Sequence, residues 1–112
     1  MRGRFDEMPA EEVYAGVRRC SFDSEKATVT SYSFAPGARF PLHRHPQEQI
    51  TLIETGEVEM TVGDQVQRLS AGDWSVVAGD LEHGIRAGSE GARILAIVIP
   101  RRDRIDGYTV TG

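Results

Sequence analysis

The sequence predicts an all-β protein, either a β-sandwich or a barrel of two antiparallel sheets. The segments with alternating polarity are short, turn signals separate them every 8–12 residues or so, and no segment has a long helical period. Glycine accounts for 12 of the 112 residues, against a usual share of about 7%, which favours many tight turns. This length predicts one domain over residues 1–112, with residues 1–12 as a loosely ordered N-terminal arm.

Two strands are predicted in the first third of the chain. Residues 13–20 and 27–35 have strand-like composition and are separated by a polar stretch. In the second strand Thr28, Thr30, Tyr32 and Phe34 share one face by period-2 alternation. Pro36 and Gly37 then predict a turn.

The remaining strands follow at short intervals. A strand over residues 48–55 is predicted to break at Gly56, and residues 57–62 and 65–70 form a hairpin around Gly63 and Asp64. Strands over 74–78 and 92–99 complete the pattern. The last strand is apolar on both faces, which predicts that a second copy covers its outer face, including Leu95 and Ile97, in a homodimer.

Composition excludes several classes of protein. A net charge of −4 opposes nucleic-acid binding through a broad basic surface. No apolar run is long enough to span a bilayer, and the N-terminus lacks an apolar signal core, which predicts a soluble, cytoplasmic protein without a membrane partner. Cys20 is the single cysteine, so it has no intrachain disulfide partner, and we expect a small buried side chain.

The three histidines of the chain predict a metal site. His43 and His45 lie two residues apart, so on a strand both imidazoles point the same way. His83 follows the hairpin, near the predicted start of a strand. Imidazole suits Zn, Cu, Fe and Ni, and oxygen donors extend the range towards Mn. We expect one divalent ion per chain, with Zn, Ni, Mn and Fe all open.

The spacing around these histidines resembles the two motifs of the cupin superfamily. The first comprises Gly37, His43, His45, Gln49 and Gly56, with Gln where Glu usually stands. The second comprises Gly72 and His83, with Ala78 and Asp80 in place of the usual Pro and Gly. The resemblance implies a jelly-roll-like β-barrel with the metal inside it.

The fourth ligand is a choice between Gln49 and Glu48, which face opposite ways on a regular strand. The even step from His45 and the six-residue gap to Gly56 both favour Gln49. Hydrogen bonding of Gln49 to a neighbouring group is the alternative. A neutral Gln leaves the full charge on the ion, which favours Lewis-acid chemistry over oxidation of the metal.

A closer resemblance is to small cupins of the KdgF type, which convert unsaturated uronates to linear keto sugars with a metal held by three His and a Gln. The run from His45 to Thr51, the pair His83-Gly84 and the tail at Pro100 carry this resemblance, and Arg102 falls where the substrate-side Arg of that type would be. Ala96 and Val98 stand where that type carries Asp and Phe.

This difference changes the expected substrate. Without an acid at position 96 the proton carrier of that reaction is missing. Ile94, Ala96 and Val98 would make the wall apolar, which indicates a substrate less polar than a sugar acid. Arg39, Met60 and Trp74 are further candidates for the pocket, although a solvated surface is the expected place for Arg39 and the core for the other two.

The sequence therefore predicts an enzyme that acts on a small molecule. The metal would polarise a carbonyl or enol oxygen for enolisation or isomerisation, while Glu48 or a bound water moves protons and Arg102 faces the substrate. Two alternatives stay open: an Fe- or Mn-dependent dioxygenase and a non-catalytic ligand-binding cupin. Fold alone does not decide among them.

Overall fold

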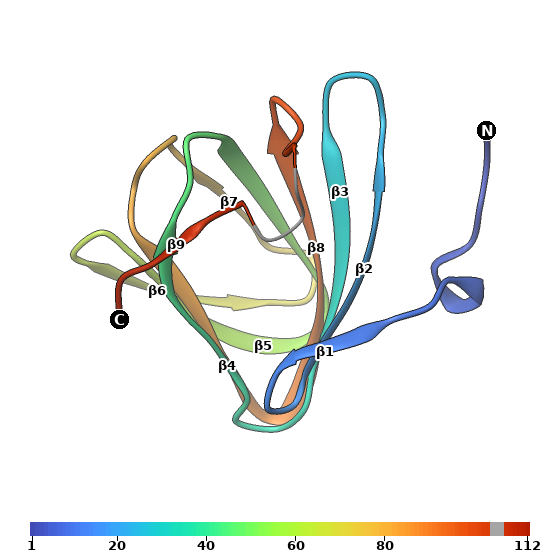
Figure 1. Ribbon diagram of the computed structural model, residues 1–112. Helices are drawn as coiled ribbons and strands as arrows, with labels where there is room; N and C mark the ends of the chain where they lie inside the picture. The colour runs from blue at the N-terminus through green and yellow to red at the C-terminus, as the bar shows by residue number, and fades with distance from the viewer. Residues whose placement is uncertain (104–106) are drawn as a thin grey trace.

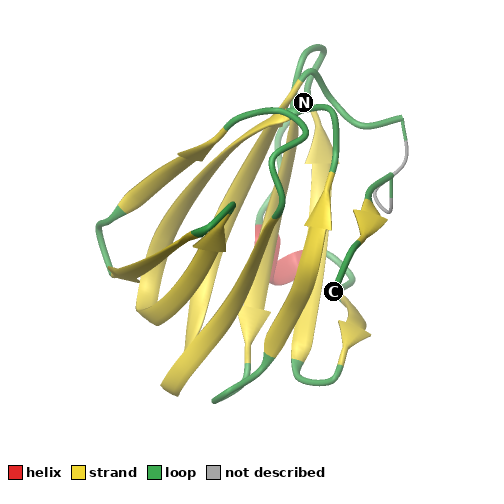
Figure 2. Cartoon of the chain, turned by 90° about the vertical axis from the view of Figure 1, so that its left-hand side faces the viewer, coloured by secondary structure: helices red, strands yellow, loops and turns green. Residues whose placement is uncertain are grey.

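The computed structural model describes residues 1–103 and 107–112, and within these ranges its regular secondary structure is almost wholly strand (Figures 1 and 2). One short 3₁₀ turn, η1 (Phe5–Glu7), precedes them. No helix in these ranges is long and apolar enough to cross a membrane. The all-β prediction is confirmed. The strands are β1 (Glu11–Tyr14), β2 (Val17–Asp23), β3 (Thr28–Phe34), β4 (Arg39–Arg44), β5 (Glu48–Val62), β6 (Gln65–Ser70), β7 (Trp74–Val77), β8 (His83–Ile99) and β9 (Thr109–Val110).

Two long strands, β5 and β8, join the two layers of the barrel. They pair antiparallel from Glu48 opposite Ile99 to Val62 opposite His83. The first half of β5 and the second half of β8 lie with β7 on one side and with β3, β2 and β1 on the other. The opposite halves lie with β6, β4 and β9. Hydrogen bonding is thus continuous around one curled sheet, which Figure 2 shows from the side.

Two of the strand boundaries that were predicted wrongly involve a glycine in the left-handed region. The strand predicted over 13–20 is two strands, because Gly16 turns the chain with φ of 77°. The break predicted at Gly56 is a bulge inside β5, where the register with β8 shifts and the chain continues. Gly56 has φ of 77°, and a Cβ there would overlap the carbonyl oxygen of Gly91.

The core lies between the two layers. The predicted inward face of β3 is confirmed, since Thr28, Thr30, Tyr32 and Phe34 are all buried. The strand predicted over 92–99 is the second half of β8, which begins at His83. The core consists of alternate residues of the long strands and of the strands beside them, including Val17, Phe40, Ile53, Val58, Met60, Val77, Ile85 and Ile94.

The N-terminal segment packs on the outside of the barrel. The Phe5 ring lies 5.8 Å from the Phe22 ring between centroids. Asp6 is 3.8 Å from the Arg93 guanidinium. Cys20, which sits under this segment, is only partly buried. Of residues 1–12, the last two already belong to β1.

Candidate metal centre

The three histidines meet inside the barrel. His43 lies on β4 directly opposite His83, the first residue of β8, and His45 follows the end of β4. Their exposed fractions are 5% for His43, 3% for His45 and 1% for His83. The candidate ligand atoms all lie within 4.8 Å of one another. This cluster is compatible with a metal site.

Backbone carbonyl groups fix the orientation and tautomer of each imidazole. The Nδ1 atoms of His43, His45 and His83 lie 2.8, 3.0 and 2.9 Å from the carbonyl oxygens of Pro41, Gln47 and Leu81. A carbonyl oxygen only accepts hydrogen bonds, so each Nδ1 must donate. Each Nε2 therefore keeps its lone pair free for a metal ion.

The surroundings also keep the imidazoles neutral. Burial, together with the positive charge that His83 would carry, lowers the pKa of His43 to about 3. Burial lowers the pKa of His83 to about 4 and also lowers that of His45. Near neutral pH all three side chains are therefore neutral bases, the form in which an imidazole can bind a metal ion, rather than cations.

Gln49 faces the same interior. Its Oε1 atom lies 3.1 Å from His45 Nε2 and 3.3 Å from His83 Nε2, and its Nε2 donates to Thr51 Oγ1 at 3.0 Å. Because His45 and His83 each carry their hydrogen on Nδ1, their Nε2 lone pairs face the lone pairs of Gln49 Oε1 with no proton between them. A cation among the four side chains relieves that repulsion, so the donor set fits a divalent ion.

The wall beside Gln49 is apolar. Val98 of β8 lies opposite Gln49 and Ala96 lies opposite Thr51. Both side chains are buried, as is Ile94. The predicted inward face of this strand is confirmed. Glu48, by contrast, is exposed on the other face of β5 from Gln49. The structure does not bring its carboxylate to the histidines.

Comparison with known proteins agrees with this arrangement. The model of the cupin domain matches residues 30–98. The chain belongs to the cupin family. No curated protein gives a significant sequence match.

Solved structures with this cupin fold include proteins of similar size. An RmlC-like cupin from Shewanella frigidimarina is 22% identical with a TM-score of 0.83, over 90% of this chain and 91% of that one. KdgF from a Halomonas species is 27% identical with a TM-score of 0.81, over 88% and 93%. A variant of oxalate decarboxylase from Bacillus subtilis is 20% identical with a TM-score of 0.86. The match covers 95% of this cupin but 31% of that chain.

Arg102, which the KdgF resemblance places on the substrate side, lies near enough to the three histidines for its charge to act on them. The side chain is buried, and its positive charge contributes to the lowered pKa of all three imidazoles. Its backbone N–H donates to Thr28 Oγ1 at 3.0 Å. The guanidinium carbon lies 5.8 Å from the centre of the Tyr108 ring.

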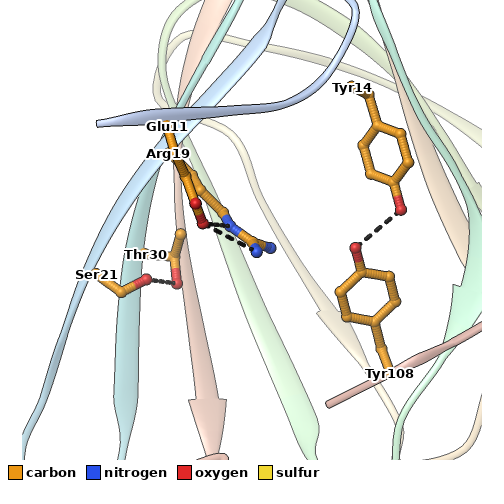
Figure 3. A network of polar contacts seen from close by, with 6 residues as sticks. All are labelled: Glu11, Tyr14, Arg19, Ser21, Thr30 and Tyr108. Carbon is orange, nitrogen blue, oxygen red and sulfur yellow. Dashed lines mark hydrogen bonds and ion pairs between the residues drawn. The ribbon is translucent and has the colours of Figure 1, made fainter. Parts of the chain in front are cut away.

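Tyr108 is a residue near the site that sequence reasoning missed. Its ring centroid lies 5.2 Å from that of His43, edge to face. Its hydroxyl is 2.8 Å from that of Tyr14 (Figure 3). It precedes β9, which pairs with β4 beside His43. This pairing between distant segments brings the C-terminal segment to the histidine cluster, so no local pattern indicated Tyr108.

The other pocket candidates lie elsewhere. Arg39 is exposed, because an irregularity in β4 between Phe40 and His43 breaks the parity that would have turned it inward. Met60 is a fully buried core residue. Trp74 was expected in the core, with the pocket as the alternative, and both were wrong: it is 66% exposed, since Ser75 and Val77 are the inward residues of β7.

Proposed function

We propose that this cupin is a metal-dependent enzyme that enolises or isomerises a small oxygenated molecule, with one divalent ion held by His43, His45, Gln49 and His83. The observation that supports it best is the meeting of four neutral donors at one buried point. Because none of these ligands carries a negative charge, they offset none of the ion's charge. A bound divalent ion supplies Lewis acidity towards a carbonyl or enol oxygen there.

The protein residues would orient this site and shield it from water. The carbonyl groups of Pro41, Gln47 and Leu81 hold the imidazoles, so that little rearrangement is needed on binding. Thr51 holds the amide of Gln49 with its oxygen towards the histidines. Arg102 would attract a negatively charged oxygen of the substrate from the side of the C-terminal segment.

The substrate would have an apolar part. Ile94, Ala96 and Val98 offer no group for a sugar hydroxyl to bind along their wall. The likeness to KdgF supports a related site, yet Ala96 and Val98 replace the acid and aromatic of that type, so we expect weak or absent activity on unsaturated uronates. The exposed position of Glu48 argues against direct proton transfer by its carboxylate.

The decisive experiment follows exchange of carbon-bound hydrogen in D₂O by NMR, using small ketones and keto acids with the metal-loaded protein. Zinc, nickel and manganese should support exchange comparably, because the proposed chemistry needs charge and an open coordination position. Gln49→Glu should retain the metal but slow exchange, since a carboxylate removes one unit of effective charge.

Three results would contradict the proposal. Turnover that needs iron and consumes oxygen, followed with an oxygen electrode, would instead identify a dioxygenase. Efficient ketonisation of an unsaturated uronate would show that another proton carrier replaces the missing acid at Ala96. Ligand binding without any exchange would indicate the non-catalytic alternative.

A further inference from the structure

A buried arginine on β2 has no role in the site described above. Arg19 is 5% exposed and lies opposite Tyr32 of β3, on the inward face. Its charge is met by Glu11 Oε1, at 3.4 Å from Nε and 3.3 Å from Nη2 (Figure 3). The Glu11 side chain is 64% exposed. Within residues 1–103 and 107–112, the buried Nη1 atom of Arg19 has no hydrogen-bond partner.

This pairing leaves the guanidinium incompletely satisfied. A single carboxylate oxygen at these distances makes weaker contacts than the paired short bonds of a guanidinium–carboxylate fork. Burying a cation is unfavourable unless its donors are used. Burial acts to lower the pKa of Arg19, but the Tyr32 and Tyr108 phenols raise it above its ordinary value. The side chain is therefore a permanent buried cation with an unused donor.

Arg19 lies close to the metal centre through Tyr108. Burial and the contact with Tyr14 raise the pKa of Tyr108 to about 12, while the positive charge of Arg19 acts against this rise. The Tyr108 ring in turn packs against His43. Arg19 and Arg102 also line one cavity of about 520 Å³, together with Ser21 and Thr28. Two buried guanidinium groups thus lie on the side of the barrel facing Tyr108.

We propose that Arg19 binds a carboxylate group of the ligand, at the position that the Glu11 carboxylate marks. This carboxylate site depends on the proposed function in one respect: the oxygenated end of the same ligand has to reach the histidines. Three exposed acids, Glu11, Asp23 and Asp103, line the cavity, and they repel a singly charged carboxylate less than a doubly charged phosphate. With the apolar wall at Ala96 and Val98, this predicts a small keto acid with an aliphatic part.

The test measures binding of levulinate, which has a carboxylate and an enolisable ketone, and of its uncharged methyl ester by calorimetry. The full-length protein is used both zinc-loaded and stripped of metal. Arg19→Gln should weaken levulinate binding about 10- to 100-fold, the usual effect of losing a charged hydrogen bond, and leave ester binding unchanged. Glu11→Gln should tighten levulinate binding about two- to fivefold, because the competing carboxylate is gone.

Arg86→Gln is the matched control, since Arg86 is exposed on the outer face of β8. If the wild type and a folded Arg19→Gln variant bind levulinate with equal affinity, the proposal is overturned. It is also overturned if inorganic phosphate binds more tightly than levulinate and that binding depends on Arg19. If Arg19→Gln does not fold, unchanged or weaker binding by Glu11→Gln overturns it. Arg19-dependent binding by metal-stripped protein supports the carboxylate site even if no hydrogen exchange is found, so the two proposals fail separately.

Discussion

Each imidazole of the histidine cluster bonds to a carbonyl group two residues away in the sequence. His43 contacts Pro41, His45 contacts Gln47 and His83 contacts Leu81. A partner this close in the chain sets the tautomer as soon as the local backbone forms. The ligand geometry is thus largely prepared by short segments, and the barrel only has to bring those segments together.

Loss of one histidine should therefore remove most of the metal. We predict about one divalent ion per chain in the wild type and a large loss of bound metal in His43→Ala and in His83→Ala. The remaining imidazoles are too few for a stable tetrahedral site. Elemental analysis after gel filtration measures this, with Arg86→Gln as the control. Full occupancy in both histidine variants would reject the site.

The choice between neighbouring residues at the fourth position can be tested separately. Gln49→Ala should weaken metal retention against a chelator, whereas Glu48→Ala should leave it nearly unchanged, because Glu48 is exposed on the outer face. Thr51→Val should give a smaller loss than Gln49→Ala, about tenfold in affinity, since Thr51 only orients the amide. The reverse order for positions 48 and 49 would show that the wrong neighbour was chosen.

For single residues, the sequence correctly predicted which side chains point inward wherever a regular strand alternates between its two faces. The even step from His45 to Gln49 placed both side chains inside, and Ile94, Ala96 and Val98 share the inward face as expected. Parity does not apply where the backbone is irregular, as in β4 between Phe40 and His43. It could not indicate Arg19, Tyr32 and Tyr108 as neighbours, because three separate segments bring them together.

Among the elements, β5 and β8 depend on two facing glycines where they bend between the layers. Gly56 and Gly91 both have positive φ, of 77° and 72°. A Cβ on Gly56 would overlap Gly91, and one on Gly91 would crowd the carbonyl oxygen of Phe34. The bend thus requires a left-handed backbone and close contact between chains at one place.

Gly56→Ala should consequently lower the free energy of unfolding by more than the left-handed backbone alone would require. That conformation costs an L-residue about 1–2 kcal/mol, and displacing the Gly91 backbone adds to it. Gly72→Ala is the matched control, because Gly72 has φ of 93° but open space around its Cβ position. Urea denaturation measures both variants. Equal losses would show that the contact with Gly91 is relieved by a small shift.

The sequence predicted most strands but not how far they extend. A glycine signals a change of direction, yet only the partner strand decides whether it ends a strand, as at Gly16, or bulges within one, as at Gly56. The first half of β8 was missed for a similar reason. It gains its strand character by pairing with β4 and β5 over long sequence separations.

At the scale of the whole molecule, the outer face of the β7–β5–β8–β3 layer is apolar. The register places Val76, Ile50, Ile97 and Val29 side by side in one row. Trp74, Leu52 and Leu95 form a second row beside it. Trp74 is 66% and Val76 50% exposed. A continuous apolar surface of this kind on a small protein marks an interaction site.

We predict that a second copy of the chain covers this face in a homodimer. Both rows cross β7, β5 and β8, so a twofold axis through Leu95 and Ile97 would bring the same surface of both copies together. Leu95→Arg should dissociate the dimer, because it places an unpaired charge at the centre of the apolar rows. Thr61→Arg, on the outer face of the other half of β5, is the matched control and should leave the dimer intact. Light scattering at micromolar concentration gives the mass of each variant. A monomeric wild type would reject the interface, and Leu95→Arg would then be harmless.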